Sequence, residues 1–201
     1  MGKQVIISIS REFGSGGRAI AEQIAKDMGL KLYERNILEE MAKEMQINAD
    51  GFAHLDEKPK KFVITRRVRE HSSSMEETFA QMQFDFIRKK ADEGESFVVL
   101  GRCSEHVLKG RDSLISIFVL GDKPQKIERV MEIYNLDREE AIQKMKRHDK
   151  SRKQYHNEHC DDKWGDSRAY DMCINSSKLG IGQTTKFLEE YIKERTQFTE
   201  V

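Results

Sequence analysis

The first 29 residues place a β-branched run, a glycine-rich turn and an amphipathic helix directly one after another. Residues 4–10 read QVIISIS, which predicts a buried strand, because β-branched residues favour extended backbone. The helix is predicted from Ile20, Ile24 and Met28, which fall at helical spacing before the stop signal Gly29. Between them lies SREFGSGG. This order puts a glycine turn at a helix amino terminus, where backbone N–H groups can bind an anion.

The same alternation of strand and helix continues along the 201 residues. Further apolar runs occur at 30–33, 96–100, 114–120 and 170–177, and helical patterns at 35–45, 75–94, 121–135, 137–159 and about 183–195. The strands are continuously apolar, as is typical of a parallel sheet covered on both faces. We therefore predict a three-layer α/β/α fold with a central parallel sheet. Residues 48–75 give no clear element.

Composition limits the classes of function. Lys plus Arg and Asp plus Glu both number 35, so the formal net charge is zero, and neither nucleic acid nor a membrane surface is favoured as a partner. The apolar runs are too short to span a bilayer, and the start of the chain lacks a signal-peptide pattern. Three cysteines form no disulfide framework. These features predict a cytoplasmic protein.

The glycine loop has the spacing of a phosphate-binding P-loop but lacks its lysine. Where Lys and Ser or Thr are expected, the chain has Gly17, Arg18 and Ala19. Arg18, one residue late, and Arg11, inside the loop, are the two candidate replacements. With Gly14, Gly16 and Gly17 they would form the phosphate cradle, and Ser15 is the nearest hydroxyl for Mg²⁺.

Two other interpretations of the loop are open. The letters GSGGRA also match a dinucleotide fingerprint, with Glu34 twenty residues after Gly14, where a ribose-binding carboxylate would lie. Against this, four residues separate the strand from the first glycine, whereas dinucleotide-binding glycines follow the strand almost at once. A glycine turn without a ligand is the third reading, and the strand–loop–helix order weighs against it.

Several segments together resemble the cytidylate kinase-like family: ISISREFGSGGRAIAEQIA, LYERNILEEMA, SFVVLGRCSEHVL, MKRHDKSRKQY and YDMCINSSKLG. The resemblance covers about residues 4–195. It implies a single P-loop kinase-like domain over 1–201, with a core of about 1–33, 94–144 and 169–201, an acceptor-binding insertion at about 34–93 and a lid at about 145–168. It also implies transfer of the ATP γ-phosphoryl group to a nucleoside monophosphate such as CMP, with Mg²⁺.

The resemblance assigns roles to particular residues. Arg147, Asp149 and Arg152 fit the R-x-D-x-x-R spacing of a lid that closes over phosphates, with the two arginines and Arg18 as the catalytic cations. Arg102 follows the strand at 96–100 and is a candidate for the acceptor phosphate, although the flanking Asp residues of true cytidylate kinases are replaced by Leu100 and Cys103. Arg35 and Asp149 complete the predicted acceptor site.

The absent lysine leaves a second function open, namely a non-catalytic nucleotide-binding protein with a degenerate P-loop. A dinucleotide-dependent oxidoreductase is the distant third. The group His156, His159 and Cys160 is interpreted as lid surface rather than a metal site, because structural zinc sites usually need two paired ligand clusters. The apolar helix at 76–91 is a candidate face for a homodimer.

Overall fold

The computed structural model describes residues 3–34, 37, 40 and 68–197. At its centre is a five-stranded sheet in the order β2-β3-β1-β4-β5, in which every pair of neighbours is parallel. The strands are β1 (Ile6–Arg11), β2 (Lys31–Tyr33), β3 (Phe97–Leu100), β4 (Leu114–Leu120) and β5 (Met172–Asn175). Parallel neighbours need crossover connections, and the intervening helices supply them. The predicted three-layer parallel α/β fold is therefore confirmed.

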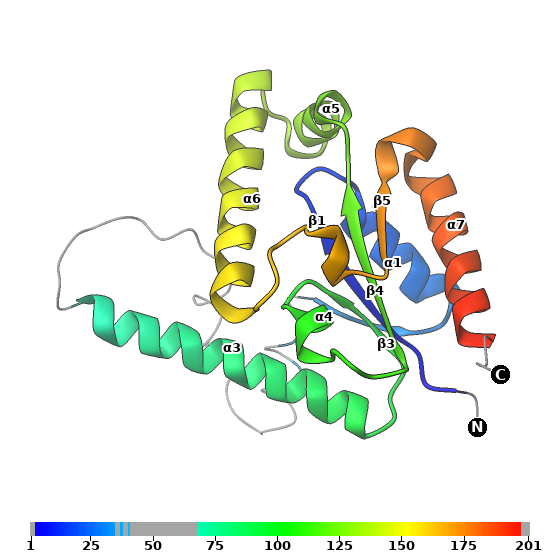
Figure 1. Ribbon diagram of the computed structural model, residues 1–201. Helices are drawn as coiled ribbons and strands as arrows, with labels where there is room; N and C mark the ends of the chain where they lie inside the picture. Colours follow the sequence, from blue (N-terminus) through cyan, green and yellow to red (C-terminus); the bar gives the residue numbers. More distant parts are fainter. Residues whose placement is uncertain (1–2, 35–36, 38–39, 41–67, 198–201) are drawn as a thin grey trace.

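The helices cover both faces of the sheet (Figure 1). On one face lie α1 (Gly17–Asp27) and α7 (Ser176–Gln197), and on the other lie α3 (Val68–Asp92) and the short α4 (Ser104–Val107). The helices α5 (Lys123–Tyr134) and α6 (Arg138–His159) pack together after β4. A 3₁₀ turn, Ser167–Ala169, leads into β5. Among the described residues, no helix is both long and apolar enough to cross a membrane.

Alternation of side chains along β1 divides the core in two. Ile7 and Ile9 face α1 and α7, where they pack with Ile20, Ile24 and Leu188. The opposite side of the sheet packs against α3, whose apolar stripe is buried there: Phe79, Phe84, Phe86 and Ile87. The aromatic stripe of the predicted dimer face therefore lies largely in the chain's own core. A third cluster joins the glycine loop to α5 and α6.

Two details differ from the sequence prediction. The last helix begins at Ser176 rather than about 183, with a kink at Gly180, whose φ of 74° is readily adopted only by glycine. The short helix α4 was not predicted, because its four residues are too few to show a helical period. The start of α6 is stabilised by a capping box between Asp137 and Glu140.

Candidate functional site

The glycine loop joins the carboxyl end of β1 to the first turn of α1. Gly14 and Gly16 both have φ of 82°, a region that only glycine enters without strain. Gly16 is the N-cap of α1 and has no side chain with which to cap it. Ser15 is buried and holds the turn: its hydroxyl donates to the Glu12 carbonyl at 2.9 Å and accepts from the Gly17 N–H at 3.3 Å. The loop therefore presents a helix amino terminus suited to an anion.

Helix α5 supports the loop from one side. The Lys126 ammonium lies 2.8 Å from the Glu12 carboxylate, which also accepts from the Gly121 N–H at 3.2 Å. Arg129 donates to the Gly14 carbonyl. Burial lowers the pKa of Arg129 from its usual value. These contacts fix the loop backbone before any ligand is bound.

Helix α6 packs on the loop from the other side. The Phe13 N–H donates to the Asp149 carboxylate at 2.7 Å, and Arg152 donates to the Arg11 carbonyl at 3.2 Å. The Phe13 ring stacks on His148 with centroids 4.3 Å apart. Burial raises the pKa of Asp149 above the usual carboxyl value. The predicted R-x-D-x-x-R segment thus touches the glycine loop directly, through two of its three key residues.

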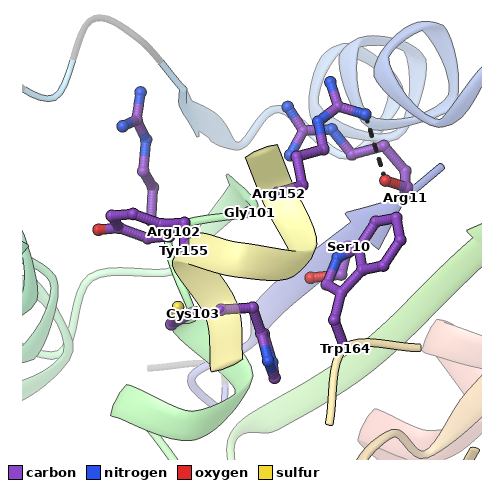
Figure 2. Close-up of a pocket in the computed structure, with 9 residues that line it drawn as sticks. Ser10, Arg11, Gly101, Arg102, Cys103, Arg152, Tyr155 and Trp164 are labelled. Atoms are coloured by element: carbon purple, nitrogen blue, oxygen red, sulfur yellow. Dashed lines mark hydrogen bonds between the residues drawn. The ribbon is translucent and has the colours of Figure 1, made fainter. Parts of the chain in front are cut away.

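Three arginines line one pocket beside the loop (Figure 2). Arg11 comes from the end of β1, Arg102 from the turn after β3, and Arg152 from α6. Arg102 is buried and donates to the amide oxygen of Gln83 on α3 at 3.3 Å. The other lining residues are Ser10, Gly101, Cys103, Tyr155, His156 and Trp164. No carboxylate is among them, so the described lining selects for an anion.

The pocket is small in this arrangement. Its volume is about 30 Å³, room for roughly one water molecule. Helix α6, which contributes Arg152, forms part of its wall. A molecule larger than water therefore fits only if a wall of the pocket moves.

A buried carboxylate, Glu105 of α4, organises the floor beneath this pocket. It accepts from the Ser10 hydroxyl at 3.3 Å and from the Tyr170 hydroxyl at 3.3 Å, and it lies 2.8 Å from the Nε2 atom of His156. Burial alone would lower the pKa of His156, but the neighbouring Cys160 and Glu105 side chains outweigh burial and raise that pKa to about 10. The imidazole is therefore a cation at neutral pH, paired with Glu105.

Replacing Glu105 by glutamine is expected to destabilise the fold by about 2 kcal/mol, because charged hydrogen bonds are worth more than neutral ones and His156 stays buried. Urea unfolding at pH 7 would measure the change. The matched control is Glu22→Gln on the exposed face of α1. Its free energy of unfolding is expected to lie within about 0.5 kcal/mol of that of the unchanged protein. Equal stability of the two variants would contradict the assigned role of Glu105.

The structure separates the predicted site residues into two groups. Arg11, Arg102 and Arg152 line the pocket, and Asp149 contacts the glycine loop. The Arg18 side chain is 64% exposed and pairs with Glu22 at 2.9 Å and Glu34 at 3.1 Å. The other two predicted cations are not placed at the pocket: Arg147 is exposed on α6, and Arg35 lies outside the described residues.

Sequence reasoning missed several residues that build the site. They are Glu12, Lys126, Arg129, Glu105, Tyr155 and Tyr170. The interpretation of His156 as lid surface was wrong, because its side chain is buried against Glu105. One signal was present: Asp149, Arg152 and His156 are spaced by three and four residues, which places them on one face of a helix. Lone residues such as Glu105 carry no comparable pattern.

The sheet order weighs against the dinucleotide interpretation. In the dinucleotide-binding fold the second strand lies beside the first, which brings its terminal carboxylate to the glycine turn. Here β3 lies between β1 and β2. Glu34, at the end of β2, is paired with Arg18.

The comparisons with known proteins agree with this geometry. Residues 6–178 match the cytidylate kinase-like family. A crystal structure of an uncharacterized protein from Eubacterium ventriosum is 40% identical, with a TM-score of 0.74, covering 94% of this chain and 99% of that one. No curated protein matches the sequence.

More distant solved structures show the same fold. The shikimate kinase from Bacteroides thetaiotaomicron is 10% identical with a TM-score of 0.54, covering 94% of this chain and 98% of that one. The shikimate kinase from Acinetobacter baumannii in complex with shikimate is 13% identical with a TM-score of 0.52, covering 97% of this chain and 96% of that one. The family match spans most of the chain and confirms the resemblance seen in the sequence. The protein is a member of the cytidylate kinase-like family, with the fold of the P-loop kinases.

Proposed function

We propose that this protein transfers the γ-phosphoryl group of ATP to a small anionic acceptor, with a nucleoside monophosphate of the CMP type as the leading candidate. One observation carries the proposal. The amino terminus of α1, whose N-cap is a glycine, lies next to a carboxylate-free pocket lined by Arg11, Arg102 and Arg152. Phosphoryl transfer needs positioning and neutralisation of charge more than covalent chemistry, and this arrangement supplies both.

Arg11 takes the place of the P-loop lysine in this proposal. A Cβ atom at Gly17 would lie 2.6 Å from the Arg11 Cβ, so the Arg11 side chain passes through the space that a side chain at position 17 would need. The guanidinium continues past Gly101, where an added Cβ would meet its terminal nitrogen. A lysine at position 17 is therefore excluded by packing, and a cation already reaches the pocket from β1. Arg18 points instead toward Glu22 and Glu34.

The acceptor's anionic group would bind Arg102, with Arg152 bridging toward the ATP phosphates. Gln83 of α3 holds the Arg102 guanidinium in place, which gives the segment at about 34–93 a part in acceptor binding. The segment at about 145–168 would act as the lid, because α6 contributes Arg152 and closes the pocket. Asp149 would release the Phe13 N–H when the lid opens.

Magnesium has no preformed protein ligand among the described residues of the loop. The Ser15 hydroxyl is engaged with Glu12 and Gly17, and the carboxylates of Glu12 and Asp149 are held by Lys126 and Phe13. Mg²⁺ commonly keeps several waters and binds through substrate phosphates, so we expect it to arrive with ATP and to neutralise phosphate charge. Ser15 as its ligand stays a prediction: the buried hydroxyl donates to Glu12 and accepts from Gly17, which leaves one acceptor lone pair for the metal.

Calorimetric titration of ATP with Mg²⁺ tests the cradle and separates the two candidate cations. Arg11→Ala is expected to weaken ATP binding by about tenfold or more, since a charged hydrogen bond is worth about 1.5–3 kcal/mol. Arg18→Ala, with the same loss of charge, is expected to change the affinity for ATP by less than about threefold, because an exposed ion pair contributes little. The reverse order would assign the role to Arg18. Absence of ATP binding by the unchanged protein would refute the proposed function.

A further inference from the structure

Two cysteines from distant parts of the chain meet beneath the arginine pocket. Cys103 follows Arg102 in the turn before α4, with φ of 53°, and is buried. Cys160 is the C-cap of α6 and packs on the same apolar cluster. The two thiols are close enough for each to shift the pKa of the other. The pair therefore joins the end of the lid helix to the turn that carries Arg102.

The two thiols have opposite electrostatic environments. The neighbouring Cys103 thiol, together with the His156 cation, outweighs burial and the nearby Glu105 and lowers the pKa of Cys160 below the ordinary thiol value. The Cys160 thiolate and burial raise the pKa of Cys103 far above that value. Cys160 is also the more accessible of the two. Cys160 is thus a thiolate at neutral pH, and Cys103 is a protonated neighbour.

His156 connects this pair to the buried carboxylate. It lies one helical turn before Cys160, and its Nε2 atom is 2.8 Å from Glu105. A cation held by an acid therefore lies next to the Cys160 thiol, which favours its thiolate form, as in activated thiols generally. The phosphotransfer chemistry proposed above uses none of these three groups.

We propose that Cys160 and Cys103 form a redox pair, in which a hydroperoxide oxidises Cys160 and Cys103 then closes an intramolecular disulfide. The Cys160 thiolate attacks the peroxide O–O bond, which gives a sulfenic acid and releases hydroxide, protonated to water. The Cys103 sulfur displaces the sulfenic oxygen, which leaves as a second water with the Cys103 proton. Two thiols lose two electrons and one peroxide gains them. A dithiol reductant reverses the reaction.

The consequence for activity rests on the proposed function. The disulfide would tie the carboxyl end of α6 to the turn beside Arg102, and both segments line the small pocket. Oxidation is therefore expected to lower kcat/KM for phosphotransfer by roughly fivefold or more, a typical coupling between two sites.

Peptide mapping of the full chain tests the thiol chemistry without reference to activity. The protein is treated with one equivalent of hydrogen peroxide, free thiols are alkylated with iodoacetamide, and the tryptic peptides are identified by mass spectrometry. The expected product links the peptide 103–109 to the peptide 154–163, while Cys173 is alkylated. Cys173 is an internal control, because it is exposed but its thiol has a raised pKa. Faster oxidation of Cys173, or a Cys160 that stays free, would overturn the proposal.

Variants assign the two roles. Cys103→Ser is expected to stop at the Cys160 sulfenic acid, which dimedone traps, whereas Cys160→Ser leaves Cys103 reduced. Cys173→Ser is expected to form the same cross-link as the unchanged protein. If Cys103→Ser or Cys160→Ser still formed an intramolecular disulfide, the proposed pairing of these two cysteines would be wrong.

Coupled assays of ADP release then compare oxidised with reduced samples of each protein. Loss of activity on oxidation, recovered with dithiothreitol and absent in Cys103→Ser, supports the regulatory role. Complete cross-linking without a change in kcat/KM would overturn it. If the reduced protein transfers no phosphate, the proposed function and the regulatory consequence fail together, and the peptide map still decides the thiol pair.

The pH dependence of alkylation gives a separate readout of how Cys160 is activated. The groups that face its thiol are Cys103, His156 and Glu105. Because the thiolate is the reacting form, the rate of Cys160 alkylation is expected to be half-maximal near pH 6 and to fall at lower pH. His156→Asn removes the cation and should move the midpoint upward, toward the ordinary thiol value. A midpoint that does not move would contradict the assigned role of His156.

Discussion

The Arg152→Ala variant is expected to lose about a thousandfold of kcat for phosphotransfer, in the range found when an arginine that stabilises a transferring phosphoryl group is removed. Arg152 donates to the Arg11 carbonyl at the end of β1 and lines the pocket with Arg11 and Arg102. The proposed function therefore places it between the glycine loop and the acceptor. A coupled assay of ADP release under saturating ATP would measure the loss.

Lys153→Ala is the matched control for this prediction. Lys153 is the next residue of α6, carries the same charge and is exposed. Its replacement is expected to change kcat by no more than about twofold, as for most surface substitutions. If Arg152→Ala kept more than a tenth of the activity, or if Lys153→Ala lost as much, the assignment of Arg152 would be wrong.

Replacing Gly17 by alanine is expected to abolish detectable ATP binding and to destabilise the fold by about 1–3 kcal/mol, the usual cost of overpacking. The added methyl group would lie 2.6 Å from the Arg11 Cβ and 3.3 Å from the Val119 Cβ, so β1 and α1 must separate. That movement displaces both Arg11 and the amino terminus of α1. Calorimetric titration with ATP and urea unfolding would record the two effects.

Gly182→Ala controls for the helical preference of alanine. Gly182 is exposed in α7, and a Cβ atom there would meet nothing within 4 Å. This variant is expected to keep ATP binding and to be unchanged or stabilised by about 0.5–1 kcal/mol. If the Gly17→Ala and Gly182→Ala variants bound ATP with equal affinity, the proposal that Arg11 takes the place of the P-loop lysine would fail.

Features that depend on local pattern could be predicted from the sequence. The glycine loop after β1 and the alternation of strands and helices follow from short-range patterns, and the structure and the family match agree with them. Helical spacing also puts Asp149 and Arg152 on one face of α6, and tertiary packing sets that face against the loop.

The choice between Arg11 and Arg18 could not be made from the sequence, because both lie within a few residues of the glycines. The choice depends on the direction in which each side chain projects from β1 or α1, and on the close packing of Arg11 against Gly17. Glu105 was equally hidden, since its partners Ser10, His156 and Tyr170 come from three other segments. Tertiary packing brings the members of a buried polar network together, so a single residue in the sequence does not predict the network.

A coupled assay of ADP release from MgATP over a panel of acceptors decides whether the protein transfers phosphate. The panel would contain CMP, the other nucleoside monophosphates and small hydroxylated carboxylates, with an acceptor-free reaction as the blank. We expect ADP release above the blank with at least one anionic acceptor, and its loss in Arg152→Ala. Tight ATP binding with no acceptor-dependent release across the panel would contradict the account and favour a non-catalytic nucleotide-binding protein.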